Sequence, residues 1–218
     1  SRSSSILSKA KSIPVPGFKN TFRFGFIAVV GYGTYRLISI VGAVSDRAEE
    51  VINNFLKNPQ SLQEVATGAG KTIITACLSK LCEPVGRTLV IVPNKSLVTQ
   101  TEEDYKIVGL DVGVYFGDRK ELNKTHTICT WQSLNILDKK SKDGEARVTL
   151  GEFLQGVKTV IIDEVHQAKA EVLKKLLTQH LNHAPLRWGL TGTVPKEQFE
   201  FQAILAGIGP VINQISAK

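Results

Sequence analysis

The stretch Val65-Ala66-Thr67-Gly68-Ala69-Gly70-Lys71-Thr72 decides the fold of this chain. An apolar approach precedes it, and an apolar run of helical character, residues 73–81, follows it. The glycines allow backbone N–H groups to close around an anion with no Cβ in the way. The helix that follows directs its positive N-terminal dipole at the same anion. The pattern predicts a phosphate-binding loop, although Val65 stands where the strict G-x-x-x-x-G-K-[ST] pattern has Gly.

Each residue of this loop has an expected task. Lys71 would reach the β- and γ-phosphates of a nucleotide, and the Thr72 hydroxyl would hold Mg²⁺. The nucleotide-binding set is Thr67, Gly68, Ala69, Gly70, Lys71 and Thr72. The alternative is a Gly-rich turn between a strand and a helix, with a surface lysine.

A second stretch supports the nucleotide interpretation. Residues Val157–Ile162 form a mostly apolar run of strand length that ends in Asp163-Glu164-Val165-His166. Two carboxylates at the end of a buried strand are costly unless a cation or a reaction needs them. Asp163 is expected to bind Mg²⁺, and Glu164 to polarise an attacking water. The alternative is an acidic pair that caps a following helix.

The amino-acid composition narrows the choice of partner and of cellular location. The chain has 218 residues, a formal net charge of +7 and a pI of about 9.3, which favour a polyanionic partner, with nucleic acid first. The three cysteines fit no metal spacing or disulfide framework, so a reducing, cytoplasmic location is expected. The N-terminus shows no secretory signal. The chain contains no Met, which indicates a fragment or missing residues.

Residues 1–58 are expected to form a small α+β accessory domain that could bind DNA. Residues 21–44 are long enough to span a membrane, but Arg36 and the recurring glycines favour two or three short antiparallel strands, and no membrane contact is expected. A helix starts at Ser45 or Asp46, shows one apolar face, and ends at Asn58-Pro59.

Residues 59–218 alternate strands with helices, which predicts an α/β domain with a parallel sheet and its ligand at the carboxyl ends of the strands. Residues 138–147 are charged and are expected to form a mobile loop. Further strands are expected at 88–92, 111–116, 125–130, 157–162 and 187–190, and helices at 73–81, 95–105, 149–155 and 168–180.

Loops after these strands offer amides, hydroxyls and cations to a nucleic-acid strand. The expected track consists of Pro93, Asn94, Lys95, Gln100, Arg119, Thr130, Trp131 and Gln132. Each signal is weak alone, because Asn94 could only cap a helix and Trp131 could belong to the core. In-line attack of water on a γ-phosphate also needs an arginine finger, and none is identifiable. Arg119 and Arg187 are expected at the surface or against nucleic acid.

With these residues in hand, the chain resembles the first RecA-like motor domain of superfamily 2 helicases of the DExH type. The matching motifs lie in the family's order: 66–72 resembles motif I, 91–100 motif Ia, 130–133 motif Ic, 163–166 motif II and 190–193 motif III. The pairing of I-V-P-x-x-x-L-x-x-Q with T-W-Q is closest to the phage UvsW type of DNA helicase. No Gln-containing adenine motif precedes Val65, so the resemblance assigns no adenine contact.

The resemblance implies a P-loop ATPase whose catalytic residues are Lys71, Asp163, Glu164 and His166, with ATP and Mg²⁺ as cofactors. Thr72 and Asp163 would hold the Mg²⁺. His166, Thr191, Gly192 and Thr193 would link nucleotide state to the DNA track. A second RecA-like domain would follow Lys218, and the fragment alone would be inactive.

The implied function is the N-terminal part of an ATP-dependent DNA helicase or translocase that remodels branched DNA, in the host cytoplasm if phage-encoded. Three alternatives stay open: an RNA helicase, a restriction-type duplex DNA translocase, and a nucleic-acid binding module without hydrolysis.

Overall fold

A computed structural model describes residues 46–66, 70–107, 109–194 and 199–215. Three expectations lie outside these residues: the tail and strands predicted within 1–45, and the loop residues Thr67, Gly68 and Ala69. In the described part of the chain, no helix has the length and apolar character needed to cross a membrane.

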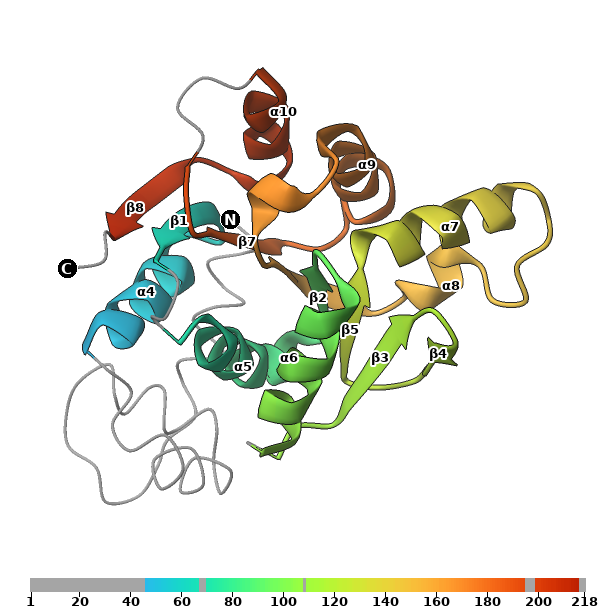
Figure 1. The fold of residues 1–218 in the computed structure, drawn as a ribbon, viewed down its shortest axis with the longest axis horizontal. Helices are drawn as coiled ribbons and strands as arrows, with labels where there is room; N and C mark the ends of the chain where they lie inside the picture. Colours follow the sequence, from blue (N-terminus) through green and yellow to red (C-terminus); the bar gives the residue numbers. More distant parts are fainter. Residues whose placement is uncertain (1–45, 67–69, 108, 195–198, 216–218) are drawn as a thin grey trace.

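The described residues form a sheet of eight strands (Figure 1). The strands are β1 (Gln60–Val65), β2 (Arg87–Val92), β3 (Val112–Phe116), β4 (Arg119–Lys120), β5 (His126–Thr130), β6 (Val157–Ile162), β7 (Leu186–Thr191) and β8 (Val211–Ile215). Their order is β4-β3-β5-β2-β6-β7-β1-β8. All neighbouring pairs are parallel except the short hairpin of β3 with β4. The predicted parallel sheet is therefore confirmed, and the carboxyl ends of its parallel strands meet at one edge.

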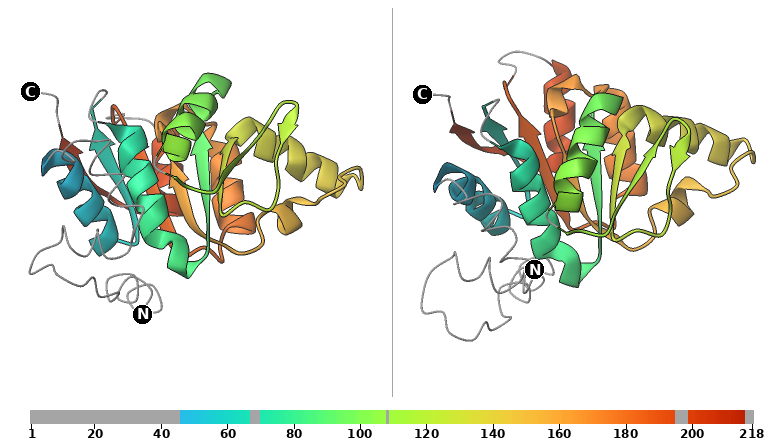
Figure 2. Two further views of the ribbon diagram at one scale, coloured as in Figure 1. Left: turned by 90° about the horizontal axis from the view of Figure 1, so that it is seen from below. Right: turned by 60° about the horizontal axis from the view of Figure 1, so that its bottom comes forward.

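Helices cover both faces of this sheet (Figure 2). One layer holds α4 (Asp46–Lys57), α5 (Lys71–Cys82) and α6 (Lys95–Ile107), and the other holds α7 (Trp131–Lys142), α8 (Leu150–Phe153), α9 (Ala170–Lys175) and α10 (Phe199–Ile208). The 3₁₀ turns η1 (Glu83–Val85) and η2 (Val165–Gln167) and the π-helical turn η3 (Leu176–His180) complete the elements. Strands buried under two helical layers read as the continuous apolar runs seen in the sequence.

The helix α4 belongs to the core of the sheet domain. Its apolar face, Val51, Ile52, Phe55 and Leu56, is buried as the sequence predicts, and the Phe55 ring lies 5.8 Å from the ring of Trp188 on β7. Gln63 on β1 donates to the carbonyl of Val51 at 2.8 Å. The accessory domain over 1–58 stays a prediction, and we propose that its boundary with the sheet domain precedes α4.

The mobile loop predicted over residues 138–147 is wrong in its first half, because α7 continues to Lys142. The reason is Asp138, whose carboxylate is buried and accepts Lys142 at 3.2 Å and Lys175 of α9 at 2.5 Å. His180 of η3 lies 3.1 Å from the same carboxylate. One buried carboxylate therefore orders a charged segment. Hydropathy alone predicts a solvated loop for such a segment.

We expect Phe55→Ala to lower the free energy of unfolding by about 3–5 kcal/mol, because the buried ring leaves a cavity against Trp188. Urea unfolding of the purified chain measures the change. The matched control is the exposed Lys57→Ala on the same helix, which should stay within about 0.5 kcal/mol of the wild type. Equal stability of the two variants would place α4 outside the core.

Candidate active site

The first turn of α5 is built to receive an anion. Gly70 precedes it in the left-handed conformation (φ 73°, ψ 40°), where a residue with a side chain would be strained. The space that a Cβ at Gly70 would occupy is open, with no described heavy atom within 4 Å. The N–H groups of Lys71 and Thr72 begin the helix, and no acidic side chain occupies this turn. The helix dipole therefore favours a negatively charged ligand here.

Lys71 and Glu164 meet across the sheet edge. Lys71 Nζ forms an ion pair with Glu164 Oε1, and both side chains are largely buried. Lys71 opens α5, whereas Glu164 follows β6, so two stretches far apart in the sequence come together. The geometry brings together the phosphate-loop lysine and the acidic pair, as the sequence analysis expects.

Asp163 lies just beneath this pair, with 7% of its surface exposed. Its N–H donates to the carbonyl of Ile91 on β2 at 2.9 Å, and its Oδ1 accepts the N–H of Glu164 at 2.9 Å. Burial raises the pKa of Asp163 to about 6, against the opposing effect of the nearby Lys71 charge. A cation beside this buried carboxylate would stabilise its ionised form.

The backbone of Glu164 is left-handed (φ 48°, ψ 54°), a costly conformation for a residue with a side chain. Its carboxylate compensates by accepting the N–H of Gly192 at 3.2 Å, besides pairing with Lys71. Strain of this kind persists where the surroundings over-determine it, so it makes Glu164 a candidate functional residue.

His166 connects the acidic pair to the end of β7. Its Nδ1 lies 2.6 Å from Thr191 Oγ1 and 3.4 Å from Glu164 Oε2. Thr191 Oγ1 in turn donates to the carbonyl of Thr193 at 2.7 Å. The four residues expected to link nucleotide state to the DNA track, His166, Thr191, Gly192 and Thr193, therefore form one hydrogen-bonded group with Glu164.

These residues fit a magnesium-bound nucleotide. Among the described residues, no three His, Cys, Asp or Glu side chains form a metal cluster. Mg²⁺ in phosphate-transfer sites is usually held by one or two protein oxygens together with the phosphates. Thr72 and the buried Asp163 would supply those oxygens, and Lys71 would release Glu164 to meet the phosphates. When bound, the metal ion neutralises phosphate charge.

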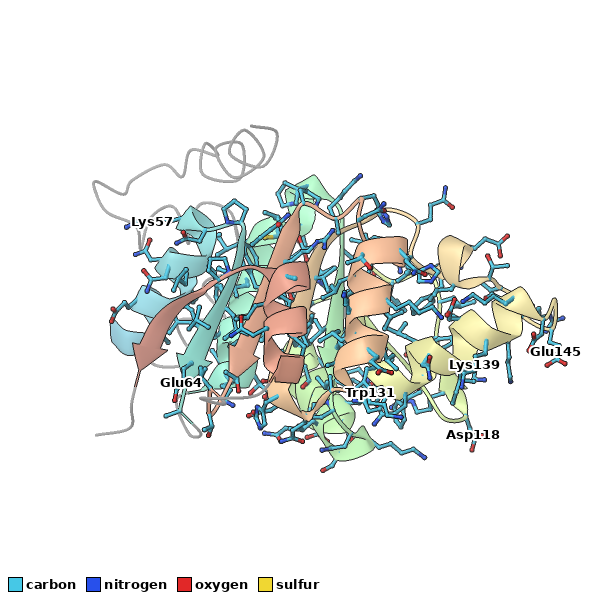
Figure 3. All side chains as sticks on the ribbon, turned by 90° about the horizontal axis from the view of Figure 1, so that it is seen from above. Lys57, Glu64, Asp118, Trp131, Lys139 and Glu145 are labelled. Carbon is cyan, nitrogen blue, oxygen red and sulfur yellow. The ribbon has the colours of Figure 1, made fainter. Side chains whose placement is uncertain are left out.

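Three of the segments expected to touch nucleic acid converge at the same edge. Gln132 Nε2 donates to the carbonyl of Pro93 at 3.2 Å, which joins the first turn of α7, directly after β5, to the loop after β2. A Cβ built on Gly117 would lie 3.7 Å from Lys95 Nζ, so the turn after β3 adjoins the same group. In Figure 3, Trp131 and Asp118 lie along the edge that also holds Glu64, and Lys57 lies at the opposite edge.

Several residues of the expected track also have structural partners. The carboxylate of Glu102 on α6 accepts two N–H groups of Arg119, at 2.7 and 2.8 Å, and this holds the pKa of Glu102 at about 2. Asn94 Oδ1 accepts the N–H of Leu97 at 3.0 Å and so caps α6. Trp131 packs against the core under α7.

The remaining track residues are Thr130, which caps α7, and the exposed Gln100 and Lys95 on α6.

Arg187 is not a surface or nucleic-acid residue, contrary to the expectation. It is buried, and its guanidinium donates to the carbonyls of Ala184 at 3.1 Å, Leu181 at 2.9 Å and Gly207 at 3.0 Å. Three backbone acceptors satisfy the charge inside the protein, so Arg187 ties β7 to the end of α10.

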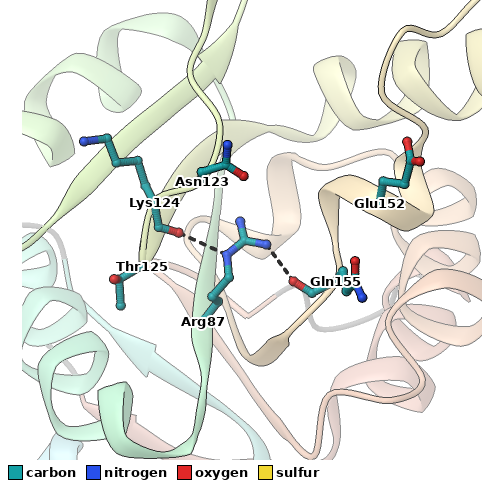
Figure 4. A pocket seen from close by; sticks show the side chains of 6 residues that line it. All are labelled: Arg87, Asn123, Lys124, Thr125, Glu152 and Gln155. Atoms are coloured by element: carbon teal, nitrogen blue, oxygen red, sulfur yellow. Dashed lines mark hydrogen bonds between the residues drawn. The ribbon is translucent and has the colours of Figure 1, made fainter.

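A polar cavity of about 340 Å³ opens at the opposite edge of the sheet (Figure 4). Its centre is Arg87, which donates to the carbonyls of Lys124 at 3.0 Å and Gln155 at 2.7 Å. These bonds fasten the start of β2 to the connections before β5 and β6. The guanidinium thus binds carbonyls of the protein's own backbone, and it lies at the sheet edge opposite the acidic pair.

Sequence reasoning missed a buried hydroxyl cluster behind α5. Tyr105 of α6 is fully buried, and its Oη lies 2.6 Å from Ser79 Oγ. Thr75 lies one turn before Ser79 and donates to the carbonyl of Thr72 at 2.8 Å. The available signal in the sequence was the pair Thr75 and Ser79, two hydroxyl residues four positions apart in a mostly apolar helix.

The fold and the site together define a RecA-like P-loop motor domain. Residues 43–196 match the family described as "Type III restriction enzyme, res subunit", and the chain belongs to this family. Within it, the chain is a superfamily 2 helicase motor domain.

The chain is similar to longer proteins. It is 26% identical to the putative DNA 3'-5' helicase Rad25 of Haloarcula marismortui over 172 residues, which cover 77% of this chain and 25% of the relative. It is 26% identical to the ATP-dependent DNA helicase Hel308 of Pyrococcus horikoshii, covering 71% and 22%. The structure of the UvsW helicase from bacteriophage T4 matches its fold with a TM-score of 0.62 at 18% identity, covering 76% and 58%. The chain thus spans about a quarter of these curated relatives.

We expect Asp163 to reduce the stability of the metal-free chain as the pH rises from about 4 to about 6, because folded Asp163 keeps its proton up to a pKa of about 6 while the unfolded side chain loses it near 3.9. Asp163→Asn should lack this contribution, so its stability relative to the wild type should rise by about 2 kcal/mol between pH 4.5 and pH 7.5. Urea unfolding with EDTA at pH 4.5 and 7.5 measures both. Parallel pH profiles for the variant and the wild type would contradict the expectation.

Proposed function

We propose that this chain is the first motor domain of an ATP-dependent DNA helicase or translocase. One observation carries the proposal: Lys71 contacts Glu164 of the acidic pair at the sheet edge where the polar segments after β2, β3 and β5 also gather. A nucleotide bound to α5 and a strand lying over those loops would therefore share one rim of the domain.

The proposed chemistry is attack of water on the γ-phosphate. Glu164 would orient the water and accept its proton, and Lys71 would leave Glu164 to stabilise the phosphate charge. Thr67, Gly68, Ala69 and Gly70 would supply backbone N–H groups to the phosphates. Neither arginine that the sequence offered as a finger is free for that role, because Arg187 is buried among carbonyls and Arg119 pairs with Glu102. The finger would come from a second RecA-like domain after Lys218, through closure of the two domains.

DNA is the substrate that we favour. The names of the matched relatives, Rad25 and Hel308, describe DNA helicases, and the basic pI of about 9.3 suits a polyanion. Branched DNA is the finer proposal and is supported by the sequence resemblance and by the matching fold of UvsW. The proposed location is the cytoplasm, that of the host if a phage encodes the chain.

A restriction-type duplex translocase is the second candidate, and the family description favours it. Hydrolysis by the full-length protein should be measured with single-stranded, forked and duplex DNA and with RNA. Stimulation by forked DNA above duplex is expected. Stimulation by duplex alone would favour translocation without strand separation, and stimulation by RNA alone would refute the DNA proposal.

We expect Lys71→Ala in the full-length protein to abolish ATP hydrolysis, and Glu164→Gln to keep nucleotide binding while lowering turnover by about 100-fold or more. Binding is followed with a fluorescent ATP analogue and turnover by phosphate release. Normal turnover by Lys71→Ala would refute the nucleotide site. Equal loss of binding and turnover in Glu164→Gln would give Glu164 a folding role instead.

For the DNA track, Lys95→Ala should weaken DNA binding uniformly across sequences and reduce the slope of log affinity against log salt by about 1, because one phosphate contact is lost. Fluorescence anisotropy at several salt concentrations measures the slope. The matched control is the exposed Lys139→Ala on α7, which should leave the slope unchanged. An unchanged slope for Lys95→Ala would remove this residue from the track.

A further inference from the structure

A group of ion pairs fastens the β3–β4 hairpin to α6. The carboxylate of Glu102 on α6 accepts Arg119 Nη1 at 2.8 Å and Arg119 Nη2 at 2.7 Å, one on each oxygen. Arg119 Nη2 also donates to Glu121 Oε2 at 2.7 Å. Because both oxygens of Glu102 meet both terminal nitrogens of Arg119, this contact fixes the plane of the guanidinium as well as its position.

The two carboxylates hold Arg119 from different sides. Only 5% of the Glu102 side chain is exposed, compared with 36% of Glu121 and 43% of Arg119. Glu102 therefore anchors the guanidinium from the protein side, and breaking that pair would leave a buried charge without compensation. An exposed ion pair contributes little free energy. The contact with Glu121 is thus the one that another anion can replace.

Arg119 keeps hydrogen-bond donors for a ligand. A guanidinium carries five N–H groups, and the two carboxylates accept three of them. In the part of the chain that the structure describes, no hydrogen bond uses the N–H of Nε. This N–H lies on the same side of the guanidinium as one N–H of Nη2, so release of Glu121 would open a second two-pronged edge. Such an edge matches the geometry of a phosphate group.

The hairpin places Arg119 beside other residues of the expected DNA track. A two-residue turn joins β3 to β4, so Arg119 begins β4 directly after the turn. A Cβ built on Gly117 in this turn would lie 3.7 Å from Lys95 Nζ. In Figure 3, Asp118 of the same turn lies along the sheet edge that also holds Trp131. The exposed guanidinium therefore adjoins the region proposed for DNA.

We propose that Glu102 is a positioning residue for DNA binding, which holds the Arg119 guanidinium at the hairpin so that a backbone phosphate can take the place of Glu121. This inference rests on the proposed function and adds a residue that acts without touching the DNA. The pairing with Glu102 withholds Arg119 from the nucleotide, but not from a strand that passes over the hairpin. Because the side chain is ordered before the DNA arrives, binding loses less conformational entropy than with a free arginine.

A purely structural ion pair is the alternative, in which Glu102 only ties the hairpin to α6. Two matched substitutions, Glu102→Gln and Glu121→Gln, separate the explanations. Each removes one negative charge that contacts the same guanidinium. Charge alone would make both variants bind a polyanion more tightly. The positioning role predicts opposite signs, because one variant releases the guanidinium from its anchor and the other removes a competitor of the phosphate.

The test measures the affinity of the full-length protein for forked DNA by fluorescence anisotropy at several salt concentrations. We expect Glu121→Gln to bind about two- to fivefold more tightly than the wild type, and Glu102→Gln about three- to tenfold more weakly. The slope of log affinity against log salt should fall by about 1 in Arg119→Ala and should also fall in Glu102→Gln. A structural ion pair would instead lower the melting temperature of Glu102→Gln and leave the slope at the wild-type value.

Two further variants test whether Glu102 acts through Arg119. In an Arg119→Ala background, Glu102→Gln should no longer weaken DNA binding, because both changes remove one interaction. Arg119→Lys keeps the charge but loses the planar fork, so it should bind about three- to tenfold more weakly than the wild type. Arg119 is exposed, and this second variant therefore does not depend on the folding of Glu102→Gln.

The outcomes separate this inference from the proposed function. A wild-type protein that does not bind DNA would refute the proposed function, and the positioning role with it. A wild type that binds DNA, together with tighter binding or an unchanged slope in Glu102→Gln, would overturn the positioning role alone. The same conclusion would follow if Arg119→Lys kept the wild-type affinity, or if Glu102→Gln weakened binding equally in the Arg119→Ala background.

Discussion

The ion pair between Lys71 and Glu164 is the contact on which the functional edge depends. It joins the first turn of α5 to the end of β6, and Glu164 reaches on to the backbone of Gly192 after β7. Without a cation at its side, Glu164 would hold an uncompensated, largely buried charge on a left-handed backbone, and both features are unfavourable. A triphosphate bound as proposed would compete for the same lysine. The pair therefore stabilises the edge as it stands here, and the proposed nucleotide would have to rearrange it.

Around this contact, the sheet edge divides into two neighbouring regions. The acidic pair, His166 and Thr191 form the region where nucleotide chemistry is proposed, and the loops joined by Gln132 and Pro93 form the region proposed for DNA. The helices α5 and α6 start in these two regions and pack against each other below them.

Much of this architecture could be predicted from the sequence, since apolar runs of strand length, glycines and acidic strand ends are local signals. The parallel sheet and the meeting of Lys71 with the acidic pair follow from such patterns, whereas the phosphate loop itself stays a prediction, because residues 67–69 lie outside the described part of the chain. The errors came from long-range partners. Arg187 reads as a surface cation but finds three carbonyls in the core, and the charged segment after Asp138 reads as a loop but is ordered by lysines from two helices. The hydrogen bond of the buried Tyr105 hydroxyl could not be predicted for the same reason, because its partner Ser79 lies on another helix.

The strand order carries one consequence for how the protein comes into being. β1, which leads into the phosphate loop, pairs with β7 and β8, so Gln60 lies opposite Arg187 and Leu62 opposite Val211. During synthesis its neighbours emerge from the ribosome long after it does, and pairing across so large a sequence separation is slow. The nucleotide site should accordingly be the last part of the domain to mature. Until then, the unpaired backbone N–H and C=O groups of β1 stay open to chaperones, or to the same strand of another nascent chain.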